Sequence, residues 1–143
     1  MGAGDVAPGR PDTPPPEADG FAAAGRTLFS MGLVREAEGN LSTLRDGTIV
    51  ITKTGARLDR LGVDDLMAGE VDEELPGASS DVAVHRRMYA EHGDGAVVHT
   101  HPVGTVPEEG GGPGEHGLYV FAASLEEAVA RTVDRVRRLS RLG

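Results

Sequence analysis

The sequence predicts an α/β fold in which a single domain has a central, mostly antiparallel sheet covered by helices. The chain has 143 residues, which suits one domain with one hydrophobic core. Segments with helical periodicity alternate along it with short runs of apolar and β-branched residues. Two of these runs flank a tight turn at Asp46-Gly47, as in neighbouring antiparallel strands. The predicted order is helix, strand, strand, helix, strand, strand, helix.

The beginning of the chain differs in composition from the rest. Residues 1–20 are rich in proline and glycine and lack apolar periodicity, so they cannot bury enough surface to offset the entropy lost on ordering. We therefore expect a flexible tail over 1–20 and the folded domain over 21–143. Phe21 and Leu28 lie at helical spacing, and residues 21–31 predict the opening helix.

The middle of the domain contains a predicted hairpin and two predicted helical segments. Residues 36–55 alternate polar and apolar side chains around the turn, which is typical of two paired strands. Residues 60–67 carry acidic side chains near their start and predict a short turn of helix. Residues 77–93 predict a longer helix, with serine and aspartate in capping positions and Gly93 at its end.

The last third of the chain predicts two strands and a closing helix. A buried strand covers 95–101 and ends at Pro102, because proline cannot donate to a sheet ladder. A glycine-rich loop then leads to a strand over 118–123. The helix over 124–139 begins with a serine cap, acidic residues in its first turn and arginines towards its end.

Composition narrows the classes of partner. The formal net charge of −9 argues against a nucleic-acid surface, because phosphate backbones are bound through clustered lysine and arginine. The chain has no cysteine, so any transition metal must be held by imidazole and carboxylate groups. No apolar run is long enough for a membrane span, and no targeting segment is evident. We expect a cytoplasmic protein that binds a small molecule.

Two histidines in "AVVHTHP" form the first candidate site. His99 and His101 are two residues apart in a predicted strand, so their side chains share one face and could bind one ion, or simply end the strand. His116 opens the next strand and can reach the same point if the two strands are neighbours. Three imidazoles with a position open to water suit Zn²⁺ or a similar divalent ion. His85 and His92 are interpreted as surface or packing residues of the longer helix.

A second candidate site combines small polar residues with glycines. Backbone amides freed by glycine, hydroxyl groups and the start of the longer helix could together bind a phosphate, although each piece alone is also typical of a turn or cap. Asp81 begins that helix, where its carboxylate either caps the helix or transfers a proton near a metal. The other candidate residues are Asn40, Thr54, Gly55, Ser79 and Ser80.

The order of these motifs resembles the class II aldolase/adducin family, whose best-known enzymes are fuculose-phosphate and ribulose-phosphate aldolases and epimerases. The resemblance covers about residues 21–139. It implies a class II aldolase-like fold, His99, His101 and His116 as metal ligands, the small polar residues as the substrate phosphate pocket, and Asp81 as the catalytic acid/base. The segments that carry it are "GLVREAEGNLSTL", "ITKTGARLDRLGVDDLM", "GASSDVAVHRRMYAEH", "AVVHTHP" and "EHGLYVFAASLEEAV".

The resemblance also implies an activity. In the family, Zn²⁺ or another divalent transition metal chelates the carbonyl and adjacent hydroxyl of a ketose phosphate and stabilises the enediolate left by bond cleavage. We therefore expect a metal-dependent aldolase acting on a small phosphorylated sugar, with Asp81 moving the proton. The alternatives are a dehydratase or epimerase of the same family, and a non-catalytic adducin-like binding domain. A homo-oligomer is expected, as tetramers are common in the family.

The chain departs from the family pattern in two places. Glutamate usually stands where this chain has Asp81, whose side chain is shorter by one methylene. Relatives place further elements between the "HTHP" and "HG" motifs, whereas here the thirteen residues 103–115 join them. The sequence therefore predicts a shortened member of the family.

Overall fold

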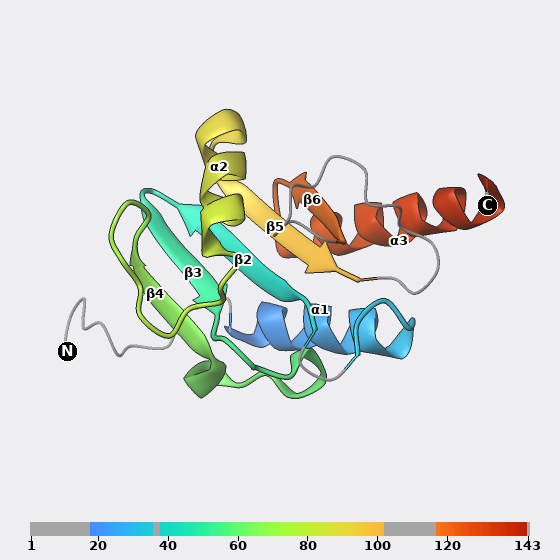
Figure 1. Ribbon diagram of the computed structural model, residues 1–143, viewed down its shortest axis with the longest axis horizontal. Coiled ribbons are helices and arrows are strands. Elements are labelled where there is room, and N and C mark those ends of the chain that lie inside the picture. Colours follow the sequence, from blue (N-terminus) through green and yellow to red (C-terminus); the bar gives the residue numbers. More distant parts are fainter. Residues whose placement is uncertain (1–17, 36–37, 102–116, 143) are drawn as a thin grey trace.

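A five-stranded sheet lies at the centre of the computed structural model, which describes residues 18–35, 38–101 and 117–142. The strands lie in the order β4-β3-β2-β5-β6, and each neighbouring pair is antiparallel (Figure 1). The predicted single domain with an antiparallel sheet covered by helices is thus confirmed. The strands are β2 (Asn40–Arg45), β3 (Thr48–Thr52), β4 (Leu66–Glu70), β5 (Gly95–Thr100) and β6 (Leu118–Ala122).

Three α-helices cover the sheet in the described part of the chain. Helices α1 (Ala18–Ser30) and α3 (Leu125–Leu142) pack on one face, and α2 (Val82–His92) lies on the other (Figure 1). All three were predicted, but α1 begins three residues earlier than expected. The tail predicted over the preceding residues lies outside the described residues and stays a prediction. No helix in the described ranges is long and apolar enough to cross a bilayer.

The predicted helical turn over 60–67 is wrong at its last two residues, which belong to a strand. Two short 3₁₀ helices, η1 (Leu58–Arg60) and η2 (Val63–Asp65), precede the edge strand β4, which the sequence did not predict. The acidic residues do sit in a helical turn, where Asp65 accepts a 2.8 Å hydrogen bond from the backbone of Gly62. Pairing with β3 then draws the following residues into extended backbone. Tertiary hydrogen bonding overrides the local preference at this point.

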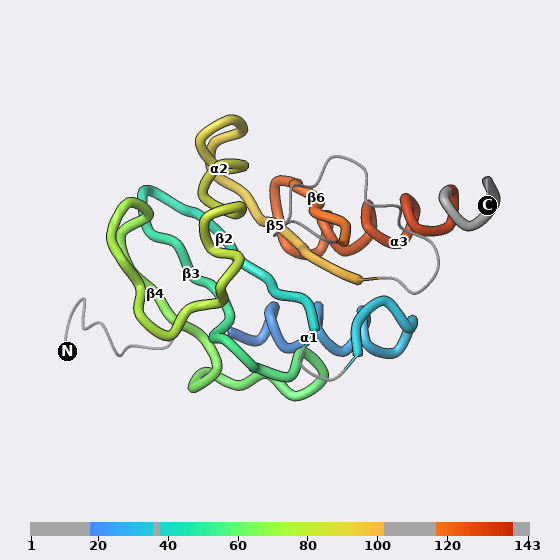
Figure 2. The backbone as a smooth tube through the Cα atoms, viewed as in Figure 1, coloured from blue at the N-terminus to red at the C-terminus, as the bar shows by residue number. Residues whose placement is uncertain are grey.

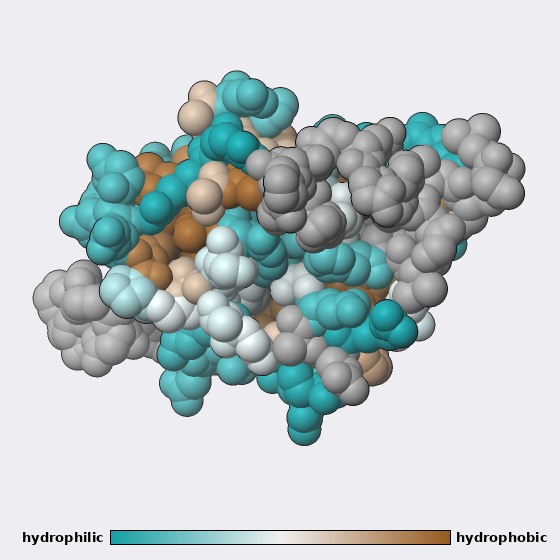
Figure 3. Space-filling view, in the orientation of Figure 1, coloured by the Kyte–Doolittle hydropathy of each residue, from teal (hydrophilic) through white to brown (hydrophobic). Residues whose placement is uncertain are grey.

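The two faces of the sheet bury different kinds of side chain. Alternate residues of β2, β5 and β6, such as Leu41, Val98 and Val120, pack with α1 and α3 in the main core, where Phe21 is the one aromatic residue. A smaller apolar cluster around Val97 lies under α2. Figure 3 shows this second face, with apolar surface between α2 and strands β3 and β4. The main core is therefore built almost entirely from aliphatic side chains, in keeping with the 3% aromatic content of the chain, whereas the smaller cluster includes Tyr89.

The path of the chain brings α2 over the centre of the sheet. Strand β4 is at one edge, and the next strand in sequence, β5, pairs with β2 on its far side. The connection between them therefore crosses β3 and β2, and α2 forms its last part (Figure 2). The start of α2 consequently lies above the ends of β2 and β5, where the polar residues gather.

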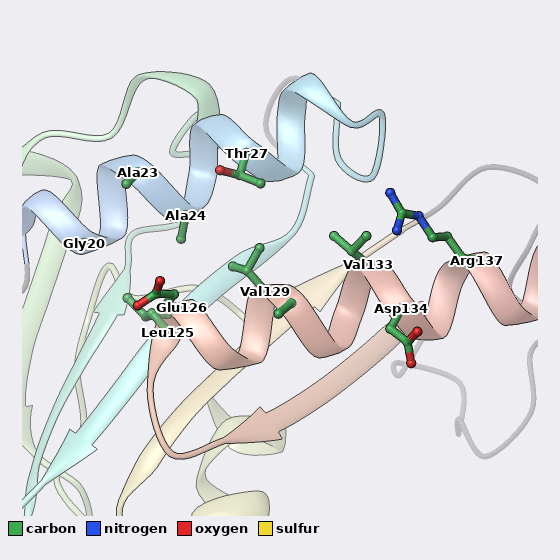
Figure 4. Close-up of a pocket in the computed structure, with 11 residues that line it drawn as sticks. Gly20, Ala23, Ala24, Thr27, Leu125, Glu126, Val129, Val133, Asp134 and Arg137 are labelled. Atoms are coloured by element: carbon green, nitrogen blue, oxygen red, sulfur yellow. The ribbon is translucent and has the colours of Figure 1, made fainter.

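A groove of about 660 Å³ lies between α1 and α3, on the opposite face from α2. Its described lining is mostly small and apolar, with Ala24, Thr27, Val129 and Val133 facing one another across it (Figure 4). None of the lining residues is a histidine, and Asp134 and Arg137 are at one end. This groove is separate from the polar site described below.

The close approach of α1 to η1 gives a test of the helix packing. A β-carbon at Gly25 would lie 1.9 Å from the carbonyl oxygen of Leu58, whereas one at Gly20 meets nothing within 4 Å. We expect Gly25→Ala to lower the free energy of unfolding by about 2 kcal/mol or more, because backbone must move. Gly20→Ala, the matched control, should raise it by up to about 1 kcal/mol through helix propensity. Urea unfolding followed by circular dichroism measures both, and equal stability of Gly25→Ala and wild type would contradict the packing.

Candidate active site

A row of polar and aromatic side chains crosses three neighbouring strands at one end of the sheet. Asn40 on β2 is paired with His99 on β5, and His99 is paired with Tyr119 on β6. Because directly paired residues project from the same face, these three side chains lie on the face that carries α2. His101 follows His99 by two residues and so continues on that side. The sheet register therefore assembles the row from residues far apart in the sequence.

Helix α2 covers this row with a stripe of its own. Asp81 immediately precedes the helix, and His85 and Tyr89 are its two buried residues. The three side chains are spaced four residues apart, which places them on one face of the helix. The stripe faces Asn40 and Ser42, which are two residues apart on β2 and share a face.

Hydrogen bonds join the two stripes into one buried chain. The hydroxyl oxygen of Ser42 lies 2.7 Å from the Tyr89 hydroxyl and 2.6 Å from Nδ1 of His85. Nε2 of His85 contacts Oδ1 of Asn40, and Nδ2 of Asn40 donates a 2.8 Å hydrogen bond to Oδ2 of Asp81. The chain thus runs without interruption from Tyr89 to Asp81.

Asp81 occupies the N-cap position of α2 but does not act as a cap. Its carboxylate makes no capping hydrogen bond with the described first turn of the helix. Oδ2 instead accepts from Asn40 and lies 3.1 Å from Nδ1 of His99. Of the two interpretations left open by the sequence, the one in which the Asp81 side chain caps the helix is wrong. The carboxylate faces the histidine pair instead.

The histidine pair has a geometry that suits one shared ion. The ring centroids of His99 and His101 are 4.6 Å apart, and the buried His99 ring stacks flat on Tyr119 at 3.9 Å. A β-carbon built on Gly117 would lie 3.0 Å from Nε2 of His99 and 3.2 Å from Nδ1 of His101. These two nitrogens therefore face the same small space. With Asp81 against its other nitrogen, His99 has the carboxylate–imidazole arrangement that orients metal ligands.

The third predicted ligand, His116, lies outside the described residues. Within residues 18–35, 38–101 and 117–142, no group of three or more histidine, cysteine, aspartate or glutamate side chains could hold a metal ion. A complete ligand set therefore remains a prediction.

The predicted phosphate residues are brought together around one polar pocket of about 260 Å³. Two loops form it, joined by a bridge between Lys53 and Ala78 and by hydrogen bonds of 3.0 and 2.7 Å from the backbone and hydroxyl of Thr54. Lys53 is the single lysine of the sequence and was not predicted, although it stands within the quoted "ITKTG" segment. All of the predicted phosphate residues and Asp81 line the pocket, and its other lining residues include one further carboxylate, that of Glu38. The lining residues are Glu38, Gly39, Asn40, Lys53, Thr54, Gly55, Ser79, Ser80, Asp81 and His101.

His85 and His92, interpreted from sequence as surface or packing residues, have different environments. The exposed His92 stacks on Phe121 with ring centroids 4.7 Å apart. His85 is completely buried, and burial lowers its pKa to about 3, with a smaller lowering by His99 and an opposing effect of Asp81. Burial likewise raises the pKa of Tyr89. Both His85 and Tyr89 are therefore neutral at pH 7.

The sequence contained a signal for this buried chain that our interpretation missed. Asn40 and Ser42 are two residues apart in a predicted strand, and Asp81, His85 and Tyr89 repeat every four residues in a predicted helix. Each spacing places polar groups on one face. Two such stripes in one small domain indicate facing partners, because buried polar groups need hydrogen bonds.

Comparison with known proteins identifies the family of this chain. The family model described as Class II Aldolase and Adducin N-terminal domain matches residues 19–107. The chain belongs to the class II aldolase and adducin family. The resemblance of the motifs is thereby confirmed.

Curated relatives in the family carry the name methylthioribulose-1-phosphate dehydratase. The protein of that name from Bradyrhizobium sp. strain BTAi1 is 32% identical over 115 residues, which cover 78% of this chain and 53% of the relative. The one from Sorangium cellulosum is 35% identical over 83 residues, 53% of this chain and 39% of that protein. The chain spans about half the length, or less, of these curated relatives.

Solved structures of the family share the fold. L-fuculose-1-phosphate aldolase from Thermus thermophilus is 38% identical, with a TM-score of 0.54, over 58% of this chain and 45% of that chain. YgbL from Escherichia coli is 21% identical, with a TM-score of 0.73 over 86% of both chains, which supports the fold alone. The class II aldolase-like fold is confirmed.

Burial of neutral His85 predicts a dependence of stability on pH. Its pKa of about 3 in the folded protein lies below the ordinary 6.5, so the unfolded chain binds more protons between these pH values. The contribution of neutral His85 is complete above about pH 6.5 and is lost as pH falls towards 3. We expect it to add about 1.4 kcal/mol per pH unit to the slope of unfolding free energy across this window.

Urea unfolding at a series of pH values measures this slope. His85→Gln should flatten the slope between pH 6 and 4, because the titrating group is gone. The same change at the exposed His92 should leave the slope unchanged. An unchanged slope in His85→Gln would show that His85 is already protonated, or accessible to water, in the folded protein.

Proposed function

We propose that this chain is a metal-dependent lyase that removes water from a small ketose phosphate. The observation that carries the proposal is the position of Asp81, whose carboxylate contacts His99 and also lines the polar pocket. A proton-transfer group, two imidazoles and a site of the right chemistry for phosphate therefore meet at one end of the sheet. The identity of the Bradyrhizobium dehydratase over 78% of this chain favours dehydration among the reactions of the family.

We assign the metal to His99, His101 and, as the third ligand, His116. Imidazole nitrogens suit Zn²⁺ and similar divalent ions, and the chain has no cysteine to compete. Gly117 directly follows His116 in the sequence and borders both described rings, which supports this assignment. When bound, such an ion supplies a Lewis acid that polarises the carbonyl group of the substrate.

The polar pocket is assigned to the phosphate group of the substrate. Lys53 supplies a positive charge beside backbone amides near Gly55 and the hydroxyl groups of Ser79 and Ser80. Oγ of Ser79 accepts a 3.2 Å hydrogen bond from the backbone of Asp81, so its own hydrogen is not needed for that bond and can be donated to a ligand. In a chain with net charge −9, this local set is what makes an anion site favourable.

Asp81 is assigned as the acid/base group. Dehydration requires a base to take the proton from the carbon beside the carbonyl, and an acid to protonate the hydroxyl that leaves the next carbon as water. Oδ2 of Asp81 accepts a hydrogen bond from Asn40 and lies 3.1 Å from Nδ1 of His99, so we assign Oδ1 to face the substrate. The carboxylate is partly exposed, which lets a ligand in the pocket reach it.

Aldol cleavage is the second candidate reaction, and the 38% identity to the Thermus aldolase favours it. It needs the same polarised carbonyl, but the base takes the proton from a hydroxyl group and a carbon–carbon bond breaks. The two reactions therefore differ in their products rather than in the groups required. The expected homo-oligomer is also part of this proposal, and sedimentation of the purified chain tests it.

The metal assignment is tested by elemental analysis of freshly purified protein. We expect about one divalent ion per chain, and a loss of at least 10-fold in metal affinity in His99→Ala, because one of few ligands is removed. His92→Ala, the matched control, changes a histidine outside the site and should keep the ion. Equal metal content in His99→Ala and wild type would exclude His99 as a ligand.

The reaction is tested with methylthioribulose 1-phosphate as substrate and mass spectrometry of the product. Dehydration yields a single product lighter by one water, whereas aldol cleavage yields two fragments. Asp81→Asn should lower kcat by about 100-fold or more while metal content stays close to wild type, because the residue can no longer take a proton. Unchanged turnover in Asp81→Asn would remove Asp81 from the mechanism, and an inactive wild type that binds metal would favour an adducin-like binding domain.

A further inference from the structure

Three members of the hydrogen-bonded chain behind the pocket, Ser42, His85 and Tyr89, have no part in the steps assigned so far. We propose that His85 is a positioning residue, whose Nε2–H holds the Asn40 carboxamide in the orientation that donates to the Asp81 carboxylate. This inference rests on the proposed function of Asp81. It assigns a purpose to a fully buried histidine that packing alone would not require.

The direction of each hydrogen bond follows from the chemistry of the groups. An ionised carboxylate can only accept, so the atom of Asn40 that lies 2.8 Å from Asp81 must be its amide nitrogen. The amide oxygen of Asn40 then faces His85, and it too can only accept. Nε2 of His85 must therefore carry a hydrogen. With the amide reversed, an oxygen would face the carboxylate and the two groups would repel.

The other side of the ring accommodates a hydrogen on Nε2. A neutral imidazole carries one N–H, so Nδ1 of His85 is the acceptor of the 2.6 Å hydrogen bond from the Ser42 hydroxyl. The Ser42 oxygen in turn accepts from the Tyr89 hydroxyl at 2.7 Å. Ser42 and Tyr89 can thus satisfy the tautomer that Asn40 needs, with one hydrogen for each contact.

Burial makes this orientation costly to lose. Asn40, Ser42, His85 and Tyr89 are each at most 4% exposed, so bulk water cannot replace a missing partner. Asn40 belongs to β2, which is paired on both sides, whereas Asp81 and His85 belong to the start of α2. The chain therefore ties the helix that carries the acid/base group to the rigid sheet.

Three variants separate positioning from packing. His85→Gln keeps an amide N–H that can reach the Asn40 oxygen, and His85→Leu has a similar volume but no donor. His92→Gln makes the first change at an exposed position seven residues further along the same helix. Metal content and thermal unfolding of each variant establish that the fold and the metal site are intact before rates are compared.

With methylthioribulose 1-phosphate as substrate, we expect His85→Leu to lower kcat by about 10- to 100-fold, with a smaller change in KM. His85→Gln should recover most of the lost rate, and His92→Gln should match wild type. Wild-type turnover in a folded His85→Leu would overturn the inference. Equal losses in His85→Leu and His85→Gln would also overturn it, because the effect would then come from packing.

Nitrogen-15 NMR of the histidine rings and of the Asn40 side chain tests the same inference without turnover. We expect His85 to carry its hydrogen on Nε2 at neutral pH, and Ser42→Ala to shift part of the population to the other tautomer. The Asn40 amide signals should keep their wild-type positions in His85→Gln and move in His85→Leu.

A hydrogen on Nδ1 of wild-type His85 would overturn the inference even if the enzyme is active. If wild type shows no turnover, the proposed function fails, and the Asn40 signals still decide whether His85 orients Asn40 and Asp81. If His85→Leu does not fold, the tautomer of His85 measured in wild type and in Ser42→Ala decides whether the inference holds.

Discussion

The 2.8 Å hydrogen bond from the Asn40 carboxamide to the Asp81 carboxylate is the interaction on which the candidate site depends. It crosses from the sheet to the start of α2, and it explains why Asp81 faces His99 instead of capping its own helix. Because a carboxylate can only accept, this bond also sets the orientation of Asn40 and the hydrogen required on His85. Geometry, protonation and the assignment of the acid/base group are thus linked through one amide.

The arrangement of the sheet reflects the cost of burying these polar groups. The face under α1 and α3 is apolar and supplies most of the core, whereas the face under α2 holds a polar row beside a smaller apolar cluster. A buried polar row is tolerable only if every member has a partner, since an unpaired group costs about 1–3 kcal/mol. The chain from Tyr89 to Asp81 supplies such partners for Asn40, Ser42 and His85, so their stability and their positioning come from the same hydrogen bonds.

Much of the fold could be predicted because its elements carry strong local patterns. The closing helix shows this well: the serine predicted as its cap does accept a 3.1 Å hydrogen bond, from the backbone of Glu127. Strand β4 could not be predicted, since its residues have weak strand preference and become extended through pairing with β3. His85 was interpreted as a surface or packing residue because it was considered alone, apart from Asp81 and Tyr89 at the same four-residue spacing on the helix.

The sequence by itself determined the three helices, the hairpin at Asp46-Gly47 and the shared face of His99 and His101, because each follows from periodicity within a few residues. Only the tertiary structure decided that Asp81 turns away from the helix end and that His85 is buried between Ser42 and Asn40. The partners in these contacts are 41 to 45 residues apart in the chain. Contacts over such separations depend on sheet register and helix placement, which no local pattern specifies.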